Sequence, residues 1–175
     1  MLTVQGRTLA GLILENWQLG RRKHIWLSVG TDLKLDAERD LADVGASDIP
    51  VVLLNKIPYG GVDVMHKALP EGVLFLTYSS LIAANDGGQS RIDQLLQWCG
   101  EDFDGLIMFD ECHKAKNLMP EVGSSPTRTG LKALEIQERL PNARVVYCRS
   151  VTALDLMITS LNIVVQQITY MLTKS

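Results

Sequence analysis

The sequence predicts an α/β fold built on a mostly parallel sheet with helices on both faces. Short apolar runs alternate along the chain with stretches in which apolar residues recur at helical spacing. Several of these runs, such as Leu106–Phe109, are continuously apolar, which is typical of strands buried on both faces of a parallel sheet. Strands that alternate with helices in this way indicate a parallel sheet joined by helical crossovers.

The elements can be expected in order from these patterns. Helical spacing over 7–22 predicts a helix that is ended by Gly20 and the basic cluster Arg21 to Lys23. Such a cluster suits the carboxyl end of a helix, and the alternative is contact with nucleic acid. The segment 55–70, with its proline and glycines, is a loop or a small excursion, and 117–128 is a surface loop. The further helices expected are 32–44, 90–98 and 130–140, and the strands are 24–29, 50–54, 72–78, 106–109 and 143–148.

The composition is that of an ordinary globular chain and argues against several classes of protein. The chain has 175 residues, 46% of them hydrophobic and 21% charged, which suits one domain rather than two large lobes. Its net charge of -3 gives no overall electrostatic case for nucleic-acid binding. Three widely spaced cysteines disfavour a zinc site or a disulfide framework and fit an intracellular, reducing compartment. We see no secretory signal and no apolar stretch of membrane-spanning length.

Two adjacent carboxylates, Asp110 and Glu111, follow the apolar run 106–109 directly. Ligands of parallel sheets bind outside the carboxyl ends of the strands, where this pair would lie. One carboxylate there can hold a hydrated magnesium ion while its neighbour orients an attacking water. A bare Asp-Glu pair is more often a solvated acidic turn. Here Cys112, His113 and two lysines complete a D-E-x-H box, the Walker B motif of superfamily-two helicases.

An ordered series of further segments accompanies this box. They are 6–11 (GRTLAG), 28–34 (SVGTDLK), 36–41 (DAERDL), 55–56 (NK), 77–81 (TYSSL), 97–100 (QWCG), 103–105 (FDG) and 109–117 (FDECHKAKN). In this order they resemble the strawberry notch family of large helicase-like ATPases. The resemblance covers 6–148 and implies a P-loop NTPase, RecA-like domain, the first lobe of the family's motor. The tail 149–175 diverges from the family.

The resemblance assigns catalytic roles by position. Asp110 would hold magnesium, Glu111 would activate water, and His113 would couple the nucleotide state to the other lobe. The family implies ATP and Mg as cofactors, DNA or chromatin-associated proteins as partners, and regulation of transcription in the nucleus. No membrane partner is expected.

Two other segments match binding regions of the family. Gly6, Arg7 and Thr8 correspond to the tail of the phosphate loop and would bind nucleotide. Thr77 and Ser79 correspond to a segment that touches the nucleic-acid backbone in related helicases. The residue types alone fit helix capping after a strand equally well for these two hydroxyls.

The sequence departs from the family at both ends of the resemblance. Where the family has a glycine-rich loop ending in Gly-Lys, this chain reads Leu2-Thr-Val-Gln5, so Gln5 replaces the Walker lysine. We expect the first strand and the phosphate loop to be missing, which would leave a gap inside the sheet and exposed edges. Three or four lost charge-assisted hydrogen bonds remove roughly 5–10 kcal/mol, comparable with the roughly 8 kcal/mol of micromolar binding.

At the other end, Arg149-Ser-Val-Thr-Ala-Leu154 replaces the family's Ser-Ala-Thr motif, and we expect the second lobe to be absent. Apolar residues at helical spacing in 149–175 predict an amphipathic helix, which either covers the sheet or binds a partner. Two functions stay open. The chain is part of an ATP-dependent helicase-like regulator, or it is a truncated or alternatively spliced interaction module without ATPase activity.

Overall fold

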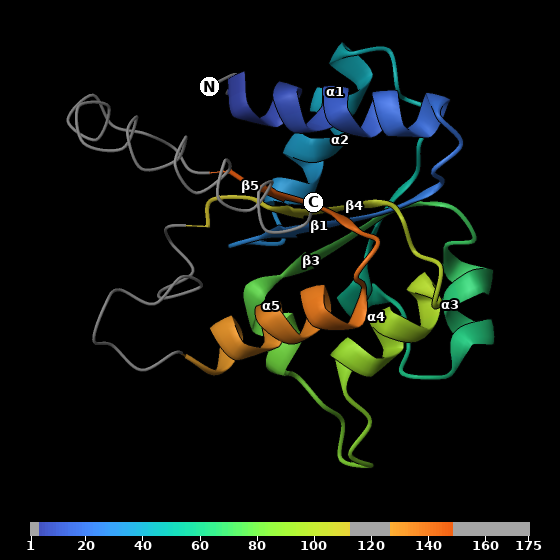
Figure 1. Ribbon diagram of the computed structural model, residues 1–175, viewed down its shortest axis with the longest axis vertical. Coiled ribbons are helices and arrows are strands. Elements are labelled where there is room, and N and C mark those ends of the chain that lie inside the picture. The colour runs from blue at the N-terminus through green and yellow to red at the C-terminus, as the bar shows by residue number, and fades with distance from the viewer. Residues whose placement is uncertain (1–3, 113–126, 149–175) are drawn as a thin grey trace.

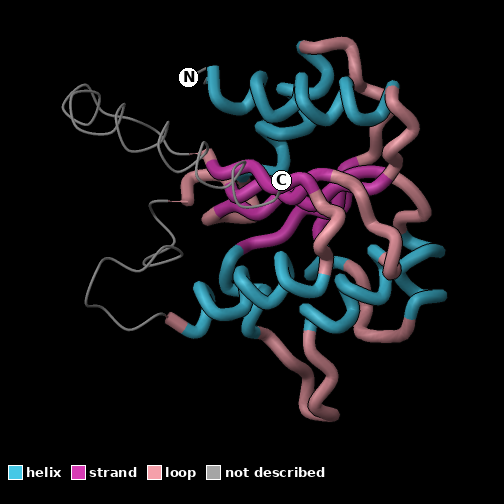
Figure 2. Tube along the Cα trace, in the orientation of Figure 1, coloured by secondary structure: helices cyan, strands magenta, loops and turns pink. Residues whose placement is uncertain are grey.

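The computed structural model describes residues 4–112 and 127–148, which form three layers (Figure 1). Five strands make the middle layer, with two helices on one face and three on the other (Figures 1 and 2). The strands are β1 (Lys23–Ser28), β2 (Val51–Leu53), β3 (Gly72–Thr77), β4 (Leu106–Phe109) and β5 (Arg144–Tyr147). The helices are α1 (Val4–Gln18), α2 (Leu33–Asp43), α3 (Val62–Ala68), α4 (Arg91–Cys99) and α5 (Arg128–Arg139), with 3-10 turns η1 (Leu54–Lys56) and η2 (Tyr78–Ile82).

The strands lie in the order β2-β3-β1-β4-β5, and every neighbouring pair is parallel. The predicted parallel α/β sheet is therefore confirmed. Each strand is hydrogen-bonded to the next, so the expectation of a gap inside the sheet is wrong for the described part of the chain. Strand β5 forms one edge, and its side chains are half-buried or exposed. Parallel order places all five carboxyl ends along one edge of the sheet.

Successive residues of β1 face opposite layers, which explains its continuous apolar run. Ile25 and Leu27 pack with the helices α3, α4 and α5, whereas Trp26 packs with α1 and α2. All three are almost fully buried, and each such burial contributes roughly 1.5–3 kcal/mol. A strand sandwiched in this way needs apolar residues at every position rather than at every second one.

The element boundaries differ from expectation mainly near the amino terminus. Helix α1 begins at Val4 rather than at residue 7, and the chain turns at Gly20, where φ is +88°. The segment 55–70 is a small excursion that contains helix α3. Helix α4 begins after Ser90, whose side chain accepts a hydrogen bond from the Asp93 N–H, an ordinary N-cap.

Several predictions fall outside the described residues. These are the position of His113, most of the loop expected at 117–128, and the amphipathic helix expected in the tail 149–175. Among the helices that the structure does describe, none combines the length and the apolar character needed to cross a membrane.

Candidate functional site at the carboxyl end of the sheet

The two predicted catalytic carboxylates lie on a turn that is held by both neighbouring strands. The Asp110 N–H donates to Leu27 O at 2.8 Å, and the Cys112 N–H donates to Cys148 O at 3.0 Å. Between them Glu111 has φ +49°, the left-handed conformation that non-glycine residues adopt at a cost of order 1 kcal/mol or more. A strained residue that its surroundings hold in place is typical of functional sites.

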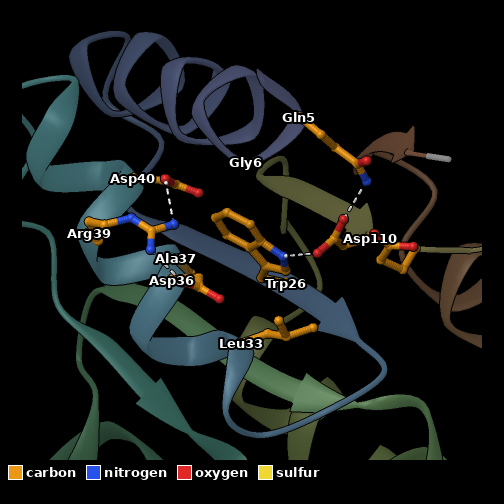
Figure 3. A pocket seen from close by; sticks show the side chains of 10 residues that line it. Gln5, Gly6, Trp26, Leu33, Asp36, Ala37, Arg39, Asp40 and Asp110 are labelled. Atoms are coloured by element: carbon orange, nitrogen blue, oxygen red, sulfur yellow. Dashed lines mark hydrogen bonds and ion pairs between the residues drawn. The ribbon is translucent and has the colours of Figure 1, made fainter. Parts of the chain in front are cut away.

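The carboxylate of Asp110 accepts hydrogen bonds at both oxygens. Gln5 Nε2 donates to Oδ1 at 2.6 Å. Trp26 Nε1 approaches Oδ2 at 3.5 Å (Figure 3). Ser28 Oγ donates to the same oxygen at 3.2 Å. Burial raises the pKa of Asp110 above its usual value, and the charge of Glu111 acts in the same direction, whereas the three hydrogen bonds oppose the shift.

A small cavity of about 100 Å³ lies beside Asp110, between α1, α2 and the sheet (Figure 3). The Arg39 guanidinium in its wall contacts Asp36 at 2.5 Å and Asp40 at 3.3 Å. With its side chains ionised, the lining has a formal excess of three negative charges, which favours a cation and repels a polyphosphate. The complete lining is Gln5, Gly6, Trp26, Leu33, Asp36, Ala37, Arg39, Asp40, Asp110 and Glu111.

Gly6, Arg7 and Thr8 lie in the first turns of α1, a helix start of the kind that follows a phosphate loop. Gly6 is buried and lines the cavity. The Arg7 side chain points to α2, where its Nη2 contacts the Asp43 carboxylate at 2.9 Å, and Thr8 is exposed. Of the three predicted nucleotide-binding residues, the structure therefore brings only Gly6 to the cavity.

Thr77 is the last residue of β3, and Ser79 lies in the turn η2 that follows it. Strand β1 separates β3 from β4 in the sheet. Thr77 Oγ1 is 2.9 Å from Ser79 Oγ and 2.9 Å from Ser80 Oγ, so the hydroxyls bond to one another. The hydroxyls therefore bond within this segment, but the expected helix capping is not seen, because the Thr77 side chain at the N-cap of η2 makes no capping hydrogen bond. The nucleic-acid contact of these residues stays a prediction. Between them, the Tyr78 hydroxyl donates to the Asp110 main-chain oxygen at 2.7 Å, and burial raises the pKa of Tyr78.

Sequence reasoning missed most of the residues that contact Asp110. Ser28 could have been found, because it lies near the carboxyl end of the strand predicted at 24–29, at the same edge of the sheet as the acidic box. Trp26 and Tyr78 carry no local signal, since both are typical core residues. Gln5 was noted only as a substitution for lysine, and its contact with Asp110 spans 105 positions of sequence.

The described residues fit a hydrated magnesium ion better than they fit a triphosphate. No group of three or more histidine, cysteine or acidic residues in this part of the chain is arranged as a metal cage. Magnesium does not require one, because it keeps several waters and binds through one or two carboxylates. A triphosphate needs converging N–H groups and a cation, and the cavity lining offers Arg39, already paired with two aspartates.

Comparison with known proteins gives one consistent family. The family model described as P-loop containing NTP hydrolase pore-1 matches residues 4–161. The protein FORGETTER 1 of Arabidopsis thaliana is 58% identical over 149 residues, 85% of this chain and 12% of that protein. Strawberry notch homolog 1 of Homo sapiens is 54% identical over 153 residues, and strawberry notch of Drosophila melanogaster is 53% identical over 154; each match covers 85% of this chain.

The chain thus spans only 12%, 11% and 9% of these three relatives. No solved structure matches it. The family match, the parallel α/β sheet and the acidic pair at its carboxyl edge agree with one another. This chain therefore belongs to the strawberry notch family, and its fold is that of a P-loop NTPase.

Proposed function

We propose that this segment supplies the magnesium-holding half of the nucleotide site of a helicase-like ATPase. The observation that carries the proposal is the position of Asp110 and Glu111 at the carboxyl end of β4, beside an acidic cavity. In a parallel sheet this edge is where nucleotide and metal ligands bind. Asp110 would hold a hydrated magnesium ion, whose charge would offset that of phosphate.

Glu111 would act as the base that orients water, and His113 would couple the site to the other lobe, as the family resemblance implies. The strained φ of +49° at Glu111 supports a functional rather than a purely structural turn. We further propose that the whole protein to which such a segment belongs acts on DNA or chromatin-associated proteins in the nucleus and regulates transcription. These partners follow from the family alone.

The segment by itself should not hydrolyse ATP. Of the residues that match the tail of the phosphate loop only Gly6 reaches the cavity, Arg7 is turned to Asp43, and the cavity has an excess of negative charge. These observations favour the second candidate function, a non-catalytic interaction module, for the isolated chain. A phosphate-release assay with magnesium, with and without DNA, tests this. DNA-stimulated turnover that Glu111→Gln abolishes would contradict it.

Rebuilding the phosphate half tests the nucleotide site itself. The variant would carry Val4→Gly and Gln5→Lys behind an added strand and glycine-rich loop of the family type. The restored N–H groups and lysine should move ATP affinity from undetectable towards micromolar, because each charge-assisted hydrogen bond contributes roughly 1.5–3 kcal/mol. Titration with a fluorescent ATP analogue measures this, with Asp110→Asn as the control. A folded, rebuilt protein that binds no nucleotide would refute the assignment.

A further inference from the structure

The hydrogen bonds of Asp110 leave little room for another ligand. A carboxylate oxygen offers about two acceptor positions. Oδ2 already has two N–H or O–H neighbours, Ser28 at 3.2 Å and Trp26 at 3.5 Å. Oδ1 has one, the amide of Gln5 at 2.6 Å. Any cation that Asp110 binds must therefore approach Oδ1, where the Gln5 amide already donates.

We propose that Gln5 is a gate on cation binding at Asp110: its side-chain amide donates to Oδ1 beside the acceptor position that is still open there, and it must swing away before the carboxylate holds a divalent cation tightly. The inference rests on the proposed function, because it regulates the same carboxylate. When Asp110 is ionised, the amide must present its NH₂ group, because a carboxylate has no hydrogen to donate to the amide oxygen. Its partly positive hydrogens repel a cation and draw electron density from the oxygen that would bind it.

The way α1 is anchored makes a side-chain gate more suitable than a helix movement. Leu9 and Ala10, one turn further along α1, are fully buried against the sheet layer, and Arg7 is held by Asp43 on α2. The backbone of the first turns is therefore fixed. Gln5 itself is only half-buried and lines the cavity wall, so its side chain can rotate towards solvent (Figure 3).

The test compares divalent-cation affinity in variants of the full 175-residue chain. Gln5→Met keeps the length of the side chain and removes the donor. Gln18→Met makes the same substitution on the exposed far end of α1 and is the matched control. Asp110→Asn, alone and combined with Gln5→Met, identifies the binding site. Binding is measured by electron paramagnetic resonance of Mn²⁺ and by competition with Mg²⁺.

We expect Gln5→Met to bind Mn²⁺ about tenfold to a hundredfold more tightly than the unchanged chain, the equivalent of one charge-assisted hydrogen bond. Gln18→Met should bind like the unchanged chain, and Asp110→Asn should remove the gain. Circular dichroism verifies folding. If Gln5→Met fails to fold, Gln5→Asn serves instead, because its amide is one methylene shorter and falls short of Oδ1.

Two other outcomes separate the gate from the site. If Gln5→Met binds Mn²⁺ no more tightly than the unchanged chain, while Asp110→Asn still lowers the affinity, the gate is wrong and the magnesium site stands. Weaker binding in Gln5→Met would mean that Gln5 is a ligand, which also overturns the gate. If Asp110→Asn leaves the Mn²⁺ affinity unchanged, or if no variant binds Mn²⁺, both the gate and the proposed function are overturned.

Discussion

The two ends of the parallel sheet use polar residues in opposite ways. At the amino end, polar groups close the structure: Lys23 Nζ donates to Trp98 O at 2.6 Å, and the buried His24 Nδ1 accepts from the Leu106 N–H at 3.2 Å. At the carboxyl end, Asp110 and its donors surround a cavity, and the pKa of the carboxyl group is raised. Burial disfavours the charged form of His24 as well as that of Asp110, and the difference is that Asp110 borders the cavity.

The basic cluster after α1, Arg21 to Lys23, lies at the amino end of the sheet. Arg21 Nε lies 3.2 Å from the Asp104 carboxylate, and the Arg22 guanidinium lies 4.7 Å from the ring centre of Trp17. Together with Lys23, these residues contact other groups of the same chain. They lie beyond the end of α1 at Gln18 rather than in its last turn, so the expected complement to a helix end is not seen. Nucleic-acid contact by the cluster stays a prediction. At the amino end Arg21 pairs with a carboxylate of the same chain, whereas at the carboxyl end acidic groups line a cavity.

The largest effect is expected from Gly105→Ala at the amino end. A Cβ atom built at Gly105 would lie 1.9 Å from Lys23 O, a backbone atom that cannot move without shifting β1. We expect the free energy of unfolding to fall by about 3 kcal/mol or more, measured by urea denaturation. Gly11→Ala is the control, because its Cβ meets nothing within 4 Å and alanine should stabilise α1 by roughly 0.5–1 kcal/mol. Equal changes in the free energy of unfolding for the two variants would contradict the close packing of Gly105 against Lys23.

His24, at the amino end of the sheet, should make the free energy of unfolding depend on pH in the acid range. Burial lowers the pKa of His24 to about 4, against about 6.5 in an unfolded chain. Between these two values the unfolded chain binds a proton that the folded chain excludes, so stability falls as pH falls through this window. The loss should approach about 3 kcal/mol at pH 4, whereas above pH 6.5 the residue has no effect.

Urea denaturation at a series of pH values measures this dependence. His24→Asn is the control, because its Oδ1 can still accept from the Leu106 N–H but the side chain does not titrate. The variant should lose less stability between pH 6.5 and 4 than the unchanged chain does. If the free energy of unfolding falls equally steeply with pH in the two proteins, groups other than His24 cause the acid sensitivity.

A smaller effect is expected at the carboxyl end from Tyr78→Phe. The change removes the donor to the Asp110 main-chain oxygen in a buried position, which should lower the free energy of unfolding by about 1 kcal/mol. It should also loosen the acidic turn, visible as faster hydrogen exchange at the Asp110 amide. Tyr59→Phe, which keeps the ring that Arg91 covers at 3.6 Å, serves for comparison. Unchanged exchange in Tyr78→Phe would mean that the strands alone hold the turn.

The smallest effect is expected from Ser79→Ala. Ser79 is exposed, and Thr77 keeps Ser80 as a second hydroxyl partner, so stability should change by less than about 0.5 kcal/mol. For the isolated chain, fluorescence anisotropy with single-stranded DNA at physiological salt should find equally weak binding before and after the change. A clear loss of DNA affinity in the variant would favour the nucleic-acid contact that the family resemblance implies.

Much of the fold follows from the sequence because its cause is local. The continuous apolar runs at 24–29, 72–78 and 106–109 predict strands buried on both faces, and the structure has β1, β3 and β4 there. The position of Asp110 and Glu111 after such a run already predicts that they lie at the binding edge of the sheet. These inferences depend only on knowing which residues are apolar and where each apolar run ends.

What only the tertiary structure decided is which distant residues meet. The strand order β2-β3-β1-β4-β5 brings Ser28, Tyr78 and Asp110 together from three segments, and the packing of α1 adds Gln5 from 105 positions away. Periodicity carries no information about such pairs, because they depend on how strands are ordered and on which face a helix covers. The largest cause of the raised pKa of Asp110 is burial, which depends on the packing, whereas the smaller effect of Glu111 follows from the sequence.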